Sequence, residues 1–229
     1  MKIIYSLYLY MRALIFSLIF MPIAILCSLI IPDSIYKVGR FISKGIFKCF
    51  HIPYTIIGEI PKNGPYILMH NHSSFLDLFF LPMIIPTKYT AIVAVKNFKI
   101  PIIGTILRRI KGIPIQRRNL QQAMDAIKIA ESRLHEGYHI CIFPEGTRTI
   151  TGKLSPFKKG GFHMAKNTNT PILPIVVKGL FEIKPKNRWI IKPQEATMII
   201  GKPITVTNKN IDTLMQEMTT FYLDHGLSI

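Results

Sequence analysis

The sequence predicts an α/β fold for most of the chain, behind an apolar N-terminal segment. Two observations carry this prediction. From residue 66 onward, short apolar runs alternate with helix-like segments, which is typical of a sheet covered by helices. Before residue 51, long apolar stretches are typical of membrane-associated helices. At 229 residues, the chain suits one globular domain with a modest appendage, which we place at residues 51–229 and 1–50.

The first apolar segment, residues 13–32, contains no charged residue. A helix of this length covers about 30 Å, the thickness of a bilayer's hydrocarbon core. Pro22 lies in its middle and would kink such a helix. We expect a membrane anchor, and a cleaved signal peptide and a buried core helix are the alternatives. Whether the anchor crosses the bilayer or enters one leaflet stays open, because cations lie on both sides of the segment.

A second apolar stretch, residues 38–60, is predicted to form an amphipathic helix. Arg40, Lys44 and Lys48 recur every four residues and therefore share one helical face. Such a helix suits the headgroup layer of a membrane. Together the two segments predict an N-terminal pair of membrane-associated helices.

The remaining elements follow from the alternation of apolar runs and helix-like segments. The expected strands are residues 66–69, 91–95, 113–115, 140–143, 172–177 and 197–200, and the expected helices are residues 74–85, 120–136, 161–167 and 210–225. Residues 180–193 are polar, basic and contain proline, so we expect a surface loop there.

The charge balance indicates an anionic partner. Lysine and arginine total 29 against 12 acidic residues, a formal net charge of +17. Nucleic acid, a phospholipid surface and a phosphate-bearing substrate all fit such an excess. Hydrophobic residues make up 49% of the chain, which favours a membrane over nucleic acid.

The three cysteines predict neither a disulfide framework nor a zinc site. Cys27, Cys49 and Cys141 are odd in number, widely spaced and lie mostly within apolar runs. We therefore expect reduced thiols in or facing a cytosol.

His72 and Asp77 form the first candidate site. The segment follows an apolar run and opens a helix. Residues five apart on a regular helix diverge by about 140°, so the two side chains meet only if His72 ends the strand and Asp77 lies in the first helical turn. A carboxylate at one imidazole nitrogen fixes the tautomer and stabilises the imidazolium, so that the ring can act as a general base on a hydroxyl. Ser73 or Ser74 would cap the helix.

Two alternatives compete for the same segment. Ser74 and Asp77 also fit a capping box, in which Asp77 only caps the helix. His70 and His72, together with Asp77, also fit a metal site. The other histidines offer no matching ligand cluster in the sequence, so we expect no metal.

Residues 143–149 form the second candidate site. They come directly after an expected strand, and ligands of α/β folds bind where strands end. Gly146 lets the backbone approach a ligand closely, and Arg148 offers a planar fork that matches phosphate. Glu145 would orient Arg148 or hold another group of the site. The alternative is an ordinary turn with a solvated arginine.

Basic residues between and beyond these segments extend the candidate anion site. Arg117 follows the expected strand 113–115, which would place it at the same sheet edge as the two sites. Lys158 and Lys159 precede an expected helix and offer another anion site. A solvated basic face is the plainer interpretation for most of these cations, so we select only Arg117 and Arg148 for phosphate.

Taken together, these segments resemble the 1-acylglycerol-3-phosphate acyltransferase family of glycerolipid acyltransferases over roughly residues 66–178. Residues 72–77 look like its His-x4-Asp catalytic block, and residues 143–148 look like its third block. Residues 96–104, ending at Arg117, look like the second block, although Lys96-Asn97-Phe98 stands where Lys-x-Glu-Leu is commoner. Residues 171–174 look like the fourth block, a proline-bearing strand near the acyl-binding region.

The resemblance implies a mixed central sheet flanked by helices, in an enzyme attached to the cytoplasmic face of the inner or cell membrane. It implies that His72 and Asp77 are catalytic. It also implies that the acceptor is bound by Lys96, Arg117, Glu145, Gly146, Thr147 and Arg148.

The reaction implied by the resemblance moves a fatty acyl group from acyl-CoA or acyl-carrier protein to the sn-2 hydroxyl of lysophosphatidic acid, giving phosphatidic acid. We expect the oxyanion donors among backbone amides near Gly146 or at the helix start. Membrane lipid is an expected partner, and no cofactor or nucleic acid is expected.

Three rival functions stay open. The first is acylation of another acceptor, such as glycerol-3-phosphate, a lyso-aminolipid or a lipid A precursor. The second is hydrolysis by the same histidine and aspartate. The third is a non-catalytic basic module that binds membrane or nucleic acid.

Overall fold

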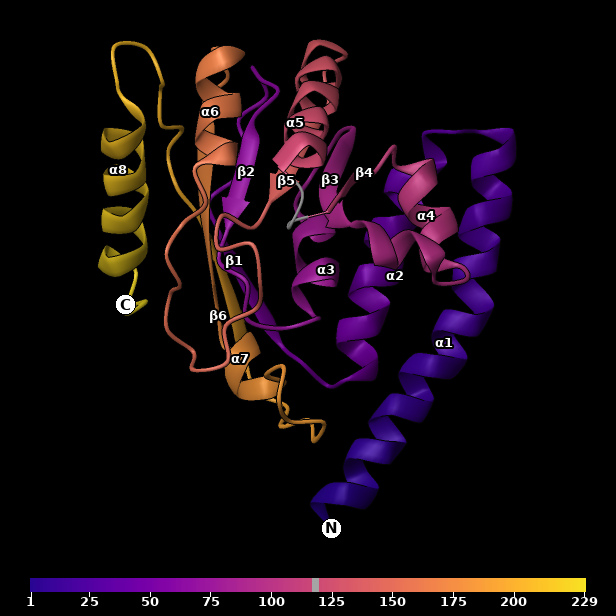
Figure 1. The fold of residues 1–229 in the computed structure, drawn as a ribbon. Coiled ribbons are helices and arrows are strands. Elements are labelled where there is room, and N and C mark those ends of the chain that lie inside the picture. Colours follow the sequence, from indigo (N-terminus) through magenta and orange to yellow (C-terminus); the bar gives the residue numbers. More distant parts are fainter. Residues whose placement is uncertain (117–119) are drawn as a thin grey trace.

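The structure, a computed structural model, describes residues 1–116 and 120–229. Within these residues the centre of the fold is a seven-stranded sheet in the order β1-β7-β6-β2-β5-β3-β4 (Figure 1). Neighbouring strands run parallel except for β6 and β7, which are antiparallel. The sheet is therefore mixed and flanked by helices, which confirms the fold expected from the sequence.

The expected strands are all present in order, whereas β1, α4 and α7 were not expected and the helix expected at residues 74–85 is shorter. The strands are β1 (Tyr54–Ile57), β2 (Ile67–His70), β3 (Tyr89–Ala94), β4 (Ile113–Ile115), β5 (His139–Ile142), β6 (Ile172–Lys178) and β7 (Ala196–Ile200). The helices are α1 (Lys2–Ile30), α2 (Ser34–Cys49), α3 (Asp77–Phe80), α4 (Ile103–Arg109), α5 (Leu120–His135), α6 (Gly160–Asn167), α7 (Leu180–Ile183) and α8 (Ile211–Asp224), with 3-10 turns η1 (Leu81–Met83) and η2 (Val95–Lys99).

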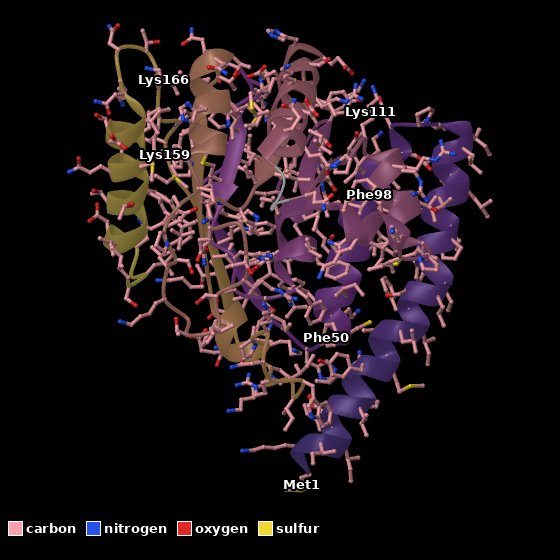
Figure 2. All side chains as sticks on the ribbon, viewed as in Figure 1. Met1, Phe50, Phe98, Lys111, Lys159 and Lys166 are labelled. Carbon is pink, nitrogen blue, oxygen red and sulfur yellow. The ribbon has the colours of Figure 1, made fainter. Side chains whose placement is uncertain are left out.

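Strand β2 lies in the middle of the sheet, and this position explains why its sequence is continuously apolar. Ile67 and Met69 point into a core shared with α5, α6 and α8, whereas Leu68 points into a core shared with α1, α2 and α3. All three side chains are fully buried, as expected for a strand covered by helices on both faces. Side chains fill both layers (Figure 2), and the carboxyl end of β2 delivers the segment containing His72 to the centre of one sheet edge.

Helix α1 runs along the outside of the domain and carries the chain's N-terminus (Figure 1). It has 29 residues and continues through Pro22, which corresponds to about 44 Å at 1.5 Å per residue. It is long and apolar enough to cross a membrane. Leu9, Ala13 and Ala24 are among the few α1 side chains buried against the rest of the protein.

Helix α2 is amphipathic, but its apolar face is used inside the protein. Lys44 and Lys48 are exposed, whereas Ile42, Ile46 and Phe47 are buried in the core shared with the sheet. The expected insertion of this face into a headgroup layer is therefore corrected. The apolar stripe meets the layer formed by α3, and burial there removes it from contact with lipid.

Two other expectations about the chain path need correction. The amphipathic stretch does not continue to residue 60, because Pro53 cannot extend a helix and Tyr54 begins β1. Residues 180–193 are more than a surface loop, since they begin with α7 and bury Ile183 and Ile191. The backbone N–H of Ile191 donates to Ser6 Oγ at 3.1 Å, which ties this segment to α1.

Candidate active site

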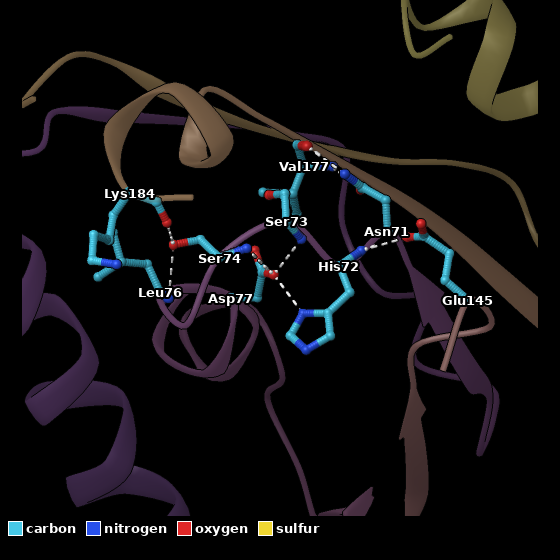
Figure 3. Close-up of polar contacts among 9 residues, drawn as sticks. All are labelled: Asn71, His72, Ser73, Ser74, Leu76, Asp77, Glu145, Val177 and Lys184. Carbon is cyan, nitrogen blue, oxygen red and sulfur yellow. Dashed lines mark hydrogen bonds and ion pairs between the residues drawn. The ribbon is translucent and has the colours of Figure 1, made fainter. Parts of the chain in front are cut away.

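His72 and Asp77 meet in the turn between β2 and α3, as the sequence predicted. Imidazole Nδ1 lies 2.7 Å from Asp77 Oδ2 (Figure 3). Asp77 is 1% exposed, whereas the His72 side chain keeps 13% of its surface accessible. Within the described residues the other ring nitrogen, Nε2, makes no hydrogen bond. The pair therefore presents an oriented imidazole with one nitrogen free for a substrate.

The helix start differs in detail from the expected serine cap. Helix α3 begins at Asp77, and the same Oδ2 accepts the backbone N–H groups of Ser73 and Ser74 at 2.9 Å each. Among the described residues no side chain caps the helix, and Ser74 Oγ instead accepts the Leu76 N–H at 3.3 Å and donates to the Lys184 carbonyl at 2.7 Å. Asp77 thus folds the turn that precedes the helix and orients the ring at once, whereas the capping box expected as an alternative is not formed by these described residues.

Phe143 holds the imidazole from its face. Its ring stacks on His72 with a centroid separation of 3.5 Å and an angle of 19° between the ring planes. Phe143 directly follows β5, and β2 and β5 are parallel neighbours, so both rings leave the sheet at the same edge. The sequence carries only one signal for this contact, an aromatic residue at the end of a strand, which does not by itself predict a role for Phe143.

Glu145 bridges the two segments. One carboxylate oxygen accepts the His72 N–H at 2.8 Å, and the other accepts the Ser155 N–H at 2.9 Å. Thr149 N–H donates in turn to the His72 carbonyl at 2.9 Å. The residue is 2% exposed, and burial raises the pKa of its carboxyl while the two backbone bonds oppose that rise. These contacts give Glu145 a role in positioning His72, as one of the two expected roles had it, and its contact with substrate stays a prediction.

Gly146 has a backbone conformation that favours glycine, and the expected close approach of a ligand stays a prediction. Its φ of +74° lies in the left-handed region, which glycine adopts at no steric cost. Within the protein, a Cβ there would meet only Lys158, at 3.5 Å, so the conformation and not crowding by protein atoms favours glycine. Its N–H donates to the Phe143 carbonyl at 2.9 Å, and the Ser73 and Ser74 amides serve Asp77, so these three expected oxyanion donors are already engaged.

Arg148 lies beside the histidine turn. It precedes Thr149, whose N–H binds the His72 carbonyl. Its charge also lowers the pKa of Lys184, although burial of that lysine is the larger cause. The Lys184 backbone carbonyl also accepts a hydrogen bond from Ser74 Oγ in the histidine turn. Thr147 is exposed next to them.

Three further cations were singled out in the sequence, and they have different outcomes. Lys96 is exposed in η2, just after the carboxyl end of β3 and thus at the same sheet edge. Arg117 lies outside the described residues. Lys159 pairs with Asp212 at 3.1 Å, which draws it toward α8.

Two buried residues next to His72 complete the picture. His70 is 1% exposed, and burial lowers its pKa to about 4, so it is neutral at physiological pH. Asn71 was missed by the sequence analysis. Its side chain both donates to and accepts from the Val177 backbone at 2.8 Å, which fixes the end of β2 to β6. An amide after a strand carries no signal that would identify such a clamp.

Comparison with known proteins agrees with this geometry. The Acyltransferase family model matches residues 51–178. A 1-acyl-sn-glycerol-3-phosphate acyltransferase from Cocos nucifera is 32% identical over 177 residues, which cover 76% of this chain and 58% of that protein. Proteins of the same name from Brassica napus and Saccharomyces cerevisiae are 34% and 30% identical, over 73% and 83% of this chain and 51% and 65% of theirs. The chain thus spans about half to two thirds of the length of these relatives.

A solved structure extends the likeness to the whole fold. PlsC, a 1-acyl-sn-glycerophosphate acyltransferase from Thermotoga maritima, superposes with a TM-score of 0.86. The match covers 98% of this chain and 96% of that one at 22% sequence identity. It includes the N-terminal helices as well as the sheet.

Proposed function

Because the chain belongs to the Acyltransferase family, we propose that it transfers a fatty acyl group to the sn-2 hydroxyl of lysophosphatidic acid and yields phosphatidic acid. The observation that carries this proposal is the His72–Asp77 pair at 2.7 Å with an accessible ring nitrogen. The names of the curated relatives support the choice of acceptor.

The proposed chemistry is general-base catalysis by His72. Nε2 accepts the proton of the acceptor hydroxyl as its oxygen attacks the carbonyl carbon of an acyl thioester. Asp77 stabilises the imidazolium through Nδ1. When the tetrahedral intermediate collapses, the ester forms, the carbon–sulfur bond breaks, and the imidazolium returns its proton to the leaving thiolate. The products are phosphatidic acid and a free thiol, and His72 ends neutral.

Arg148 is the proposed partner of the acceptor phosphate. Its guanidinium offers paired donors to a phosphate group, and its loop is bonded to the backbone of His72 on both sides. Thr147 is exposed in the same loop, and Lys96 at the same sheet edge, so both remain proposed acceptor contacts. This arrangement supports a small headgroup that touches a guanidinium while its hydroxyl reaches the imidazole.

The donor and the location follow from the lipid character of both substrates. Acyl-CoA and acyl-carrier protein both present the required thioester, and we propose one or both as donor. We propose that α1 attaches the enzyme to the cytoplasmic face of the inner or cell membrane. Its length and apolar surface support that attachment.

The decisive experiment is a transfer assay on the His72→Ala protein. General-base assistance typically contributes about 10²–10⁴-fold, so we expect acyl transfer to lysophosphatidate to fall at least about a hundredfold while the protein stays folded. His163→Ala is the matched control, because His163 is exposed on α6 and far from the site in sequence. Activity of the His72→Ala protein near that of the control would refute the base assignment.

The same assay separates the rival functions. Acyl-CoA and acyl-carrier protein are compared as donors, and glycerol-3-phosphate, a lyso-aminolipid and a lipid A precursor as acceptors. Thiol release without any acceptor would indicate a hydrolase. A preference for one of the other acceptors would keep the chemistry and change the substrate.

A further inference from the structure

We propose that the loop after α7, residues 184–193, is a second lipid-contacting element that lies on an anionic membrane surface with Trp189 in the interfacial layer. We call this segment the Trp189 loop. The inference goes beyond acyl transfer, and it rests on the proposed attachment of α1 to a membrane.

The outward face of α1 supplies the starting point. Apart from Ile19, the strongly exposed aliphatic residues in its first five turns gather within an arc of about 120° at 100° per residue. They are Ile3, Ile4, Leu7, Met11, Leu14, Ile15 and Leu18, each at least half exposed. A stripe of this kind on one side of a helix is the surface that would meet acyl chains.

The Trp189 loop is fixed along one border of this stripe. Tyr10 Oη donates to the Trp189 carbonyl at 2.7 Å, and the Ile191 N–H donates to Ser6 Oγ at 3.1 Å. On the helix, Ser6 and Tyr10 lie next to the edge of the apolar arc. The loop therefore lies at the border of the apolar stripe, at the depth where acyl chains would give way to headgroups.

The chemistry of the loop suits that layer. Trp189, the single tryptophan of the chain, is 48% exposed. Lys186 and Lys192 are exposed beside it, and the sequence has no acidic residue between Glu182 and Glu195. Tryptophan concentrates at membrane–water interfaces, and lysines near an anionic leaflet are attracted to it.

The loop is also held in shape before any lipid is present. Arg188 folds back on the protein, with Nε donating to the Ile190 carbonyl and Nη2 to the Ile183 carbonyl, both at 3.0 Å. Its charge thus braces the turn that presents Trp189. A rigid exposed indole would lose little conformational entropy on entering an interface.

The opposite border of the stripe carries the same kinds of side chain. Tyr8 is 51% exposed, and the Arg12 guanidinium lies 5.4 Å from the centre of its ring. Aromatic and basic groups thus flank the apolar stripe on both sides, the pattern of a surface that meets headgroups around a buried strip. A protein or nucleic-acid partner would not require that symmetry around an apolar centre.

The loop would also set the height of the active site above the lipid. Its first residue, Lys184, accepts the hydrogen bond from Ser74 Oγ, one turn from Asp77. A lipid contact at Trp189 is therefore connected through a few residues to the catalytic turn. Lysolipid rising from the bilayer would meet His72 at a fixed distance.

The single tryptophan makes the test direct. The full chain is placed in nanodiscs of phosphatidylcholine, with or without phosphatidylglycerol, and its fluorescence is recorded with lipids brominated near the headgroup or deep in the acyl chain. We expect a blue-shifted emission that is quenched most by the shallow bromine and more strongly when phosphatidylglycerol is present. Lys186→Glu combined with Lys192→Glu should remove the phosphatidylglycerol dependence.

A reporter elsewhere on the protein provides the control. Trp189→Phe combined with Lys166→Trp moves the indole to α6, at the far end of the molecule from Met1 (Figure 2), where we expect no quenching. Water-like, unquenched emission of Trp189 in a chain that co-purifies with the discs would overturn the loop proposal alone. A blue shift without quenching would indicate a protein-covered indole and would overturn it too. Failure to co-purify would reject both the loop contact and the attachment of α1, while leaving acyl transfer open to its own assay.

Discussion

Two buried carboxylates, Asp77 and Glu145, serve the same turn in different ways. They are 1% and 2% exposed, and both accept backbone N–H groups from residues 72–74. Only Asp77 also touches the imidazole, at 2.7 Å. The second carboxylate oxygen of Glu145 accepts the Ser155 N–H. Burial and backbone bonds therefore do not distinguish a carboxylate that acts on the reacting ring from one that holds its scaffold.

The role of each carboxylate is therefore set by whether it contacts the imidazole and not by its backbone bonds. In the proposed mechanism the imidazolium forms next to Asp77, so its negative charge is needed during the reaction. Glu145 faces only neutral amide donors, so its task is to keep two loops together. The variants below separate charge from scaffold in order of decreasing effect.

Asp77→Asn should give the largest loss. An amide keeps the shape of the side chain but does not stabilise an imidazolium, and it favours the wrong tautomer of His72. We expect kcat to fall by about 10²–10⁴-fold, the range of general-base assistance. Asp212→Asn, at an exposed pair with Lys159, is the control in the same assay. Unchanged kcat in Asp77→Asn would remove the distinction between the two carboxylates.

Arg148→Ala should act on binding of the acceptor. Charge-assisted hydrogen bonds contribute about 1.5–3 kcal/mol, so the KM for lysophosphatidate should rise about ten- to hundredfold, with a smaller effect on the KM of the donor. Arg148→Lys keeps the charge without the planar fork, so its KM for lysophosphatidate should lie between those of the unchanged protein and Arg148→Ala. Equal changes in both KM values would mean that the loop held by Glu145 does not carry the phosphate site.

Glu145→Gln should have the smallest effect on rate and a recognisable effect on pH dependence. Burial raises the pKa of Glu145 in the folded protein, so between the unfolded and folded pKa values the native state binds the extra proton. The free energy of unfolding should therefore decrease as pH rises through that window. The glutamine variant should lose this slope, as measured by urea unfolding from mildly acidic to neutral pH.

That variant also tests the scaffold role. One of its two amide positions is a donor, so either the His72 or the Ser155 N–H loses its acceptor at a cost of about 1–3 kcal/mol. We expect kcat to fall less than in Asp77→Asn. A loss as large as that of Asp77→Asn would show that Glu145 acts on the chemistry itself.

The sequence was sufficient for six of the seven strands, for the longer helices and for the His72–Asp77 contact, because these depend on local periodicity and on a fixed spacing after a strand. It was not sufficient for contacts that depend on how strands lie side by side. The stacking of Phe143 on His72 requires β2 and β5 to be neighbours, and the Asn71 clamp requires β6 on the other side. The apolar face of α2 was wrongly predicted to face lipid, because amphipathicity alone does not say whether lipid or a protein core covers such a face.

The bond between His72 and Glu145 has a consequence for how the protein is made. It joins residues 73 positions apart, and the Asn71 clamp reaches 106 positions further along the chain. During translation, α1 leaves the ribosome long before β5 and β6 exist. With the proposed attachment, α1 would reach a bilayer before the turn that carries His72 is held in place by Glu145 and Asn71.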